Sequence, residues 1–79
     1  MAIDDPNNEQ PTTWQQRLKA ERDELNARLH ELDEFLDPSN EKLGELNRMD
    51  LYLLYAQQAH MRAYLNVLNQ RVSREMLDL

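Results

Sequence analysis

Cysteine is absent from this 79-residue chain, and glycine occurs once. The lack of cysteine excludes disulfides and thiolate metal sites, and neither His30 nor His60 has a second histidine three or four residues away. We therefore expect no metal site and no cofactor. The longest apolar run, around Leu51 to Tyr55, is far shorter than the roughly 20 residues of a membrane span. The amino-terminal residues lack the basic and apolar regions of a secretory signal, so we expect neither export nor a membrane location.

Basic residues are scarce as well: nine Lys and Arg stand against fifteen Asp and Glu, for a net charge of −6. So acidic a chain has no broad basic stripe able to displace counterions from many phosphates, and duplex nucleic acid is not an expected partner. A small phosphorylated ligand needs only a few cations and remains compatible with this composition. The acids gather in residues 30–50, which we expect to form a solvated acidic end of the molecule.

The chain is long enough for one small domain, whose core alone would supply only roughly 3–5 kcal/mol. Residues 1–11 are almost wholly polar, which predicts a disordered acidic N-terminal tail followed by a domain over residues 12–79. A threonine followed three residues later by glutamine, in the stretch 12–16, is a capping-box pattern for a helix start. Leucines then recur at helical spacing up to residue 36, where Asp37-Pro38 predicts the end of the helix.

Residues 37–46 contain the only glycine and predict a connection with at most one loose helical turn. Asn47 is a plausible cap for a second helix, whose apolar residues follow a three-four alternation interrupted by Gln58. A second apolar stripe on this helix comprises Leu53, Tyr64 and Val67. Because a hairpin buries only one stripe, the second should contact another copy of the chain. We predict an all-α fold: an antiparallel two-helix hairpin (about 13–36 and 47–77) assembling into a homo-oligomeric helical bundle.

An antiparallel hairpin brings the start of its first helix beside the end of its second. An indole and several cations should meet at that end, and we take them as candidate ligand-binding residues: Trp14, Arg17, Lys19, Arg22, Arg71 and Arg74. An indole stacks on a base while guanidinium groups bind phosphate oxygens, so the pattern favours a nucleotide. The alternative is that Trp14 anchors an oligomer and the arginines are solvated. No glycine-rich phosphate loop, paired-histidine zinc motif or Ser-His-Asp arrangement is present, so we expect no enzyme.

Several short motifs recur along the two expected helices. In order they read W-Q-x-R, E-R-x-x-L and L-x-x-F-L over residues 14–36, then L-L-x-x-Q, M-x-x-Y and L-x-x-R-V over residues 53–72. Together they resemble a group of phage-encoded helical hairpins similar to the sponges that disarm CBASS and Thoeris immunity. The resemblance implies homo-oligomers, often hexamers, that hold cyclic oligonucleotides or cyclic ADP-ribose isomers between subunits in the host cytoplasm. By position, Trp14 and Arg17 match the aromatic residue and the cation of such sponges, and Arg71 matches the R-V ending.

The chain departs from the better-known CBASS sponges before its first helix, where Asp, Asn, Glu and Gln replace a basic and aromatic stretch. The identity of the ligand therefore stays open at the sequence level. The alternative function is that of an acidic hairpin that binds and inhibits a host or phage protein, with its Trp, Tyr and Arg residues as contact points.

Overall fold

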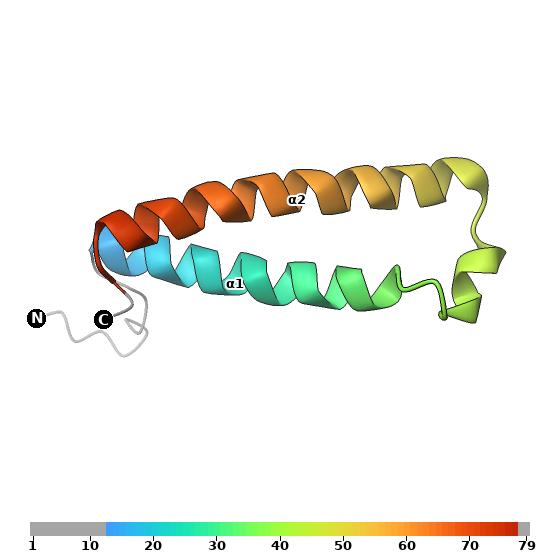
Figure 1. The fold of residues 1–79 in the computed structure, drawn as a ribbon, viewed down its shortest axis with the longest axis horizontal. Coiled ribbons are helices and arrows are strands. Elements are labelled where there is room, and N and C mark those ends of the chain that lie inside the picture. Colours follow the sequence, from blue (N-terminus) through green and yellow to red (C-terminus); the bar gives the residue numbers. More distant parts are fainter. Residues whose placement is uncertain (1–12, 78–79) are drawn as a thin grey trace, which may run out of the picture.

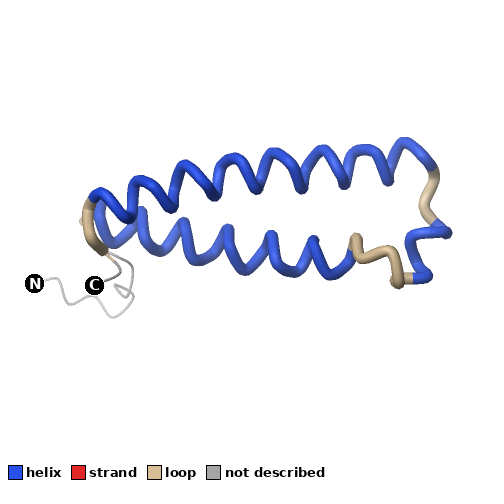
Figure 2. Tube along the Cα trace, viewed as in Figure 1, coloured by secondary structure: helices blue, strands red, loops and turns tan. Residues whose placement is uncertain are grey.

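Two long helices joined by a short helical connection make up residues 13–77, the part of the chain that the computed structural model describes (Figure 1). Helix α1 spans Trp14–Phe35, the 3-10 helix η2 spans Glu41–Glu45, and helix α2 spans Arg48–Arg74. The long helices lie antiparallel, so the start of α1 and the end of α2 share one end and η2 lies at the other (Figure 2). Residues 13–77 contain no strand, which confirms the predicted all-α hairpin, whereas the expected tail over residues 1–11 lies outside them.

Side-chain caps define where both long helices begin. The Thr13 hydroxyl accepts a hydrogen bond from the Gln16 amide at 3.1 Å, and the Gln16 side chain accepts one from the Thr13 amide at 3.3 Å. The Asn47 side chain accepts from the amide of Asp50 at 2.8 Å. Each cap satisfies an amide that has no partner within its helix, so both predicted helix starts are confirmed.

The connection is organised by two short polar side chains that follow α1. Asp37 Oδ1 accepts hydrogen bonds from the amide and the hydroxyl of Ser39, each at 2.8 Å, and these hold the pKa of Asp37 below its usual range. Asn40 donates to the carbonyl of Phe35 at 2.7 Å, and its side-chain oxygen accepts from the amide of Lys42 at 3.0 Å. Asn40 therefore satisfies the end of α1 and the start of η2 together. The single expected turn in this connection is confirmed.

The core is a narrow seam between the two long helices. Its fully buried side chains are Leu68 and Val72 of α2, and Leu18 is only 4% exposed beside them. Leu29 further along α1 and Leu36, which caps the end of that helix, are also buried. Each fully buried aliphatic side chain contributes about 1.5–3 kcal/mol to the free energy of folding. With five buried residues, the isolated hairpin exceeds the conformational entropy cost of ordering its chain by only a small margin.

A polar contact interrupts the seam where the sequence pattern placed Gln58. The Gln58 amide donates to Asp33 Oδ1 at 2.6 Å, and Arg62 Nη2 donates to the same oxygen at 2.8 Å. These bonds, Gln58 first, lower the pKa of Asp33. The Asp33 carboxylate on α1 thus accepts a hydrogen bond from Gln58, the polar residue of the α2 seam. This contact favours one register of the two helices.

The second stripe of α2 stays about half exposed, although the Tyr64 hydroxyl bonds to Glu21 of α1. Leu53 is 53% exposed, Tyr64 46% and Val67 52%, and Met49 at 62% continues the row toward the start of the helix. The spacings of four, eleven and three residues along this row return to one side of an α-helix. The hairpin by itself therefore exposes an apolar face over five turns of α2.

Helix α2 ends three residues before the predicted position, in a reversal centred on Met76. Met76 adopts a left-handed conformation with φ of 56°, and its amide donates to the Ser73 carbonyl at 3.0 Å. The amide of Leu77 donates to the Val72 carbonyl at 3.1 Å, and the Leu77 side chain packs on the buried cluster. These two bonds and the apolar contact define a Schellman motif, which turns the chain back onto its own core.

Candidate functional site

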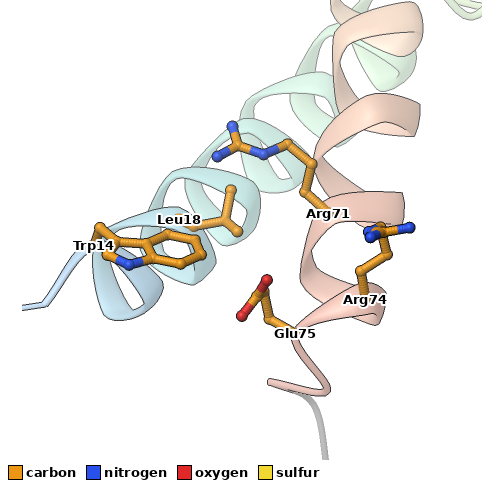
Figure 3. A pocket seen from close by; sticks show the side chains of 5 residues that line it. All are labelled: Trp14, Leu18, Arg71, Arg74 and Glu75. Atoms are coloured by element: carbon orange, nitrogen blue, oxygen red, sulfur yellow. The ribbon is translucent and has the colours of Figure 1, made fainter.

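The open end of the hairpin contains a hollow between the first turn of α1 and the last turns of α2. It has a volume of about 180 Å³ and is lined by Trp14, Leu18, Arg71, Arg74 and Glu75 (Figure 3). The structure thus brings three of the six candidate residues, Trp14, Arg71 and Arg74, together at this end.

Local structure fixes the wall that α1 contributes. The Thr13 cap starts the helix at Trp14, whose side chain is 47% exposed, and Leu18 lies one turn further along with only 4% exposure. Leu18 packs against Leu68 and Val72, so the floor of the hollow is continuous with the core. The indole is thus held at a rigid helix start with part of its ring surface open to a ligand.

The wall that α2 contributes carries charge of both signs. In Figure 3 the guanidinium of Arg71 reaches over Leu18 toward α1, and the carboxylate of Glu75 also points toward α1. The guanidinium of Arg74 instead points away from Trp14, along the outer side of α2. Within residues 13–77 no ion pair involves Arg71, Arg74 or Glu75. Arg71 is therefore the cation best placed to bind the anionic group of a molecule whose flat ring stacks on Trp14.

A second pair of residues lies within electrostatic reach of Arg71. Tyr64 donates a hydrogen bond to the carboxylate of Glu21 on α1, and this bond, followed by partial burial, raises the pKa of Tyr64. The positive charge of Arg71 acts on the same phenol in the opposite direction. The Tyr64–Glu21 contact joins the helices next to the hollow and adds an acidic group to its surroundings.

The remaining candidate cations do not line the hollow. Lys19 Nζ lies 3.1 Å from Asp23 Oδ2, and Arg22 Nε donates to Asp23 Oδ1 at 2.8 Å. These contacts, Arg22 first, lower the pKa of Asp23. Arg22 also reaches across to α2, where its Nη1 donates to Asn69 Oδ1 at 3.0 Å. Arg17 is exposed on the first turns of α1 and is not among the lining residues.

Sequence reasoning missed Glu75 as a wall of the hollow. Beside the hollow, an open and exposed stretch of the α2 surface carries four uncharged polar side chains together with Arg74: Asn66, Asn69, Gln70 and Ser73. Their i, i+3, i+4, i+7 spacing was a readable signal, because it places four hydrogen-bonding groups on one face of a helix. Arg74 belongs both to the hollow and to this open stretch of α2.

Two features are absent from residues 13–77: a cluster of metal-ligating side chains and a helix able to span a membrane. No cluster of three or more His, Asp or Glu side chains there could hold a metal ion. Neither long helix is apolar enough over a sufficient length to cross a bilayer. The chemistry available at the open end is stacking on an indole, anion binding by guanidinium groups and hydrogen bonding by amides.

Such a hairpin, with an aromatic and cationic hollow at its open end, defines a small helical protein built to hold a ligand or partner. The model of the Sequestin family matches residues 12–74, which cover both long helices and four of the five residues that line the hollow, and the chain belongs to that family. The family name indicates sequestration of a ligand or partner by binding. No curated protein and no solved structure matches the chain.

Proposed function

We propose that this protein is a non-catalytic phage anti-defence protein that sequesters cyclic nucleotide second messengers and so blocks CBASS- or Thoeris-type immune signalling. The observation that carries the proposal is the hollow in which Trp14 of α1 and Arg71 of α2 meet. Membership of the Sequestin family and the motif resemblance to phage sponges support it further. The ligand class comprises cyclic oligonucleotides and cyclic ADP-ribose isomers.

Each lining residue has a role that follows from its chemistry. The half-exposed indole of Trp14 stacks on a base, and Leu18 beneath it keeps the inner side of the hollow dry. Arg71, which forms no ion pair within residues 13–77, binds a phosphate through two parallel hydrogen bonds, and Arg74 adds a second cation. Lys19 and Arg22 are engaged with Asp23, so they contribute to the local potential rather than to direct contacts.

The size of the hollow favours a site completed by a neighbouring subunit. Its volume of about 180 Å³ falls below the roughly 300–1,000 Å³ of typical small-molecule pockets. The exposed row of Met49, Leu53, Tyr64 and Val67 offers a surface on which a second copy can pack. We therefore place the ligand between subunits of a homo-oligomer, as the sponge resemblance implies.

Sequestration requires no turnover and works by mass action. A ligand held by the protein in the host cytoplasm is withdrawn from the effector that would sense it. The effect depends on the number of sites relative to messenger molecules and on a dissociation constant below that of the effector. The absence of a nucleophile–base pair or phosphate loop from the sequence motifs agrees with this mode of action.

Calorimetric titration of the full chain with a panel of cyclic di- and trinucleotides and cyclic ADP-ribose isomers tests the proposal. We expect saturable binding of at least one member, weakened about tenfold or more in both Trp14→Ala and Arg71→Gln, since stacking on a base contributes about 1–3 kcal/mol. Arg28→Gln is the matched control, because Arg28 pairs with Glu24 at 2.9 Å on α1 and does not line the hollow.

An absence of heat with every panel member at micromolar protein would rule the proposal out. Copurification of a stoichiometric host protein, together with indifference to nucleotides, would instead favour the inhibitory acidic hairpin.

A further inference from the structure

Charged side chains are almost missing from the middle of α2. In a chain of which 30% is charged, residues 51–70 contain one arginine and no lysine, aspartate or glutamate. That arginine, Arg62, binds Asp33 of α1 at 2.8 Å and so belongs to the contact between the two helices. An exposed helix face of a monomer usually carries charges, whereas the centre of a protein–protein interface is depleted of them. The side of α2 that α1 leaves open therefore has the composition of an interface.

A second heptad series runs along this uncharged stretch. It consists of seven positions that alternate by four and three residues: Met49, Leu53, Ala56, His60, Ala63, Val67 and Gln70. At about 100° per residue, the series lies roughly 150° around the helix from the seam that packs on α1. Helix α1 runs along only one side of α2 (Figure 1), and all seven residues are exposed except Ala56, which is half-buried. Such a series is the pattern with which one helix packs against another.

The distribution of charge along the hairpin favours an antiparallel neighbour. Residues 30–50, at the connection end, contain seven acids against two bases. At the open end, Arg71 and Arg74 line the hollow with one acid, Glu75, beside them. A parallel neighbour would place two acidic connections side by side, whereas an antiparallel neighbour places each connection beside the open end of the other copy. The partner that fits this face is therefore a second copy of the chain in the opposite direction.

Side-chain size along the series is self-complementary in that orientation. Two copies of α2 can pack about a two-fold axis near residue 58, the midpoint of residues 53 and 63. Six positions then form three kinds of layer, each repeated by symmetry: Leu53 with the partner's Ala63, His60 with the partner's Ala56, and Met49 with the partner's Val67. Each layer pairs a longer side chain with a shorter one, so the helices can approach closely with few voids.

We propose that α2 of one copy pairs antiparallel with α2 of a second copy through this heptad series, in the register of those three layers. The pairing ends at Val67, one turn before Arg71. The start of the partner's α2 therefore lies beside the hollow and adds a wall to a space of only about 180 Å³. This interface rests on the proposed sequestration between subunits, but its test needs no nucleotide.

Cysteine pairing tests the orientation and the register, because the chain has no cysteine of its own. Leu53→Cys and Ala63→Cys proteins, mixed in equal amounts and oxidised with glutathione disulfide, should form the mixed dimer at least tenfold in excess over either homodimer in mass spectrometry. Two copies of residue 53 lie about ten residues, or roughly 15 Å, apart along the pair, which is too far for a disulfide. The control mixes Leu53→Cys with Ala27→Cys, on the exposed side of α1, and should show no such excess.

A pair of charged variants gives a second readout without oxidation. Leu53→Glu and Ala63→Lys should each weaken self-association in sedimentation velocity. Their mixture should associate at least tenfold more tightly than either protein alone, because opposite charges then face each other.

Three results would overturn the antiparallel pair. An excess of Leu53→Cys homodimers would indicate a parallel pair, a mixed dimer no more abundant than in the control would indicate another face, and an unsubstituted chain that sediments as a monomer would exclude any pair. Sequestration is decided separately, by titration with nucleotides.

Discussion

The hydroxyl of Tyr64 on α2 donates a hydrogen bond to Glu21 on α1, across 43 residues of sequence. This contact raises the pKa of the phenol, because a tyrosinate would lose the hydrogen bond and face a carboxylate. The positive charge of Arg71, which lines the hollow, lowers the pKa of the same phenol and so acts against the effect of Glu21. The Tyr64–Glu21 bond therefore joins the two helices close to the hollow that Arg71 lines.

An alkaline loss of stability follows from this bond. The pKa of Tyr64 in the folded chain lies above its ordinary value of 10.0, so the stabilisation is complete below pH 10 and is lost as pH rises through the raised value. Thermal unfolding followed by circular dichroism between pH 8 and 12 should show this loss. Tyr64→Phe should remove the Tyr64 component while Tyr52→Phe retains it; identical pH profiles for all three proteins would contradict the assignment.

Asp33 predicts an effect of the opposite sign at acid pH. Hydrogen bonds from Gln58 and then Arg62 lower its pKa below 3.8, so the stabilisation is present above pH 3.8 and is lost as pH falls through the lowered value. Asp33→Asn should be less stable than the unsubstituted chain at pH 7, with a difference that shrinks below pH 4. Urea unfolding at pH 7, 4 and 2 measures this difference, and Asp23 and Asp37 titrate in both proteins. A constant difference across that range would argue against an ionised Asp33 in the contact.

The left-handed Met76 predicts a stabilising substitution. A non-glycine residue in this conformation costs about 1–2 kcal/mol, whereas glycine adds roughly 0.5–1 kcal/mol of unfolded-chain entropy. Met76→Gly should therefore stabilise the hairpin by about 0.5–1 kcal/mol in thermal unfolding. Ala63→Gly in the interior of α2 is the control and should destabilise it by about 1 kcal/mol. Destabilisation by both substitutions would be inconsistent with the Schellman ending of α2.

Glu75 predicts a gain of affinity on removal of charge. Its carboxylate lines the same hollow as Arg71 and opposes any phosphate bound there. Glu75→Gln should bind a phosphorylated ligand several-fold more tightly in 50 mM salt, and the gain should shrink in 500 mM salt because screening shortens the reach of the charge. Glu31→Gln removes the same charge on α1 outside the hollow and should have no such effect. Weaker binding by Glu75→Gln would mean that the carboxylate accepts a hydrogen bond from the ligand.

The helices and their caps could be predicted because they depend on residues that are close together in the chain. A threonine or asparagine three residues before a backbone amide predicts a helix start in any protein, and leucines spaced by three and four residues predict a buried helix face. The antiparallel arrangement then brings Trp14 and Arg71 to one end without further information.

The parts that were missed depend on where side chains point after folding. The ending of α2 at Arg74 rests on a methionine in a conformation that usually requires glycine, so no residue type marks it in advance. Arg22 reaches Asn69 on α2 near the expected end, but its bonds to Asn69 and Asp23 hold it outside the residues that line the hollow. The position of Glu75 in the hollow follows from the same helix ending.

The uncovered row on α2 predicts how self-association can be broken. Leu53 and Val67 are each about half exposed on the face that α1 leaves open, so a charge there should prevent a second copy from packing. Val67→Glu and Leu53→Glu should each raise the dissociation constant of self-association about tenfold or more in sedimentation velocity. Ala27→Glu adds the same charge on the exposed side of α1 and should leave association unchanged. Because the hollow is smaller than typical small-molecule pockets, loss of association should also weaken binding of the cyclic nucleotides. An unsubstituted chain that sediments as a folded monomer and still binds the nucleotide would refute a site shared between subunits.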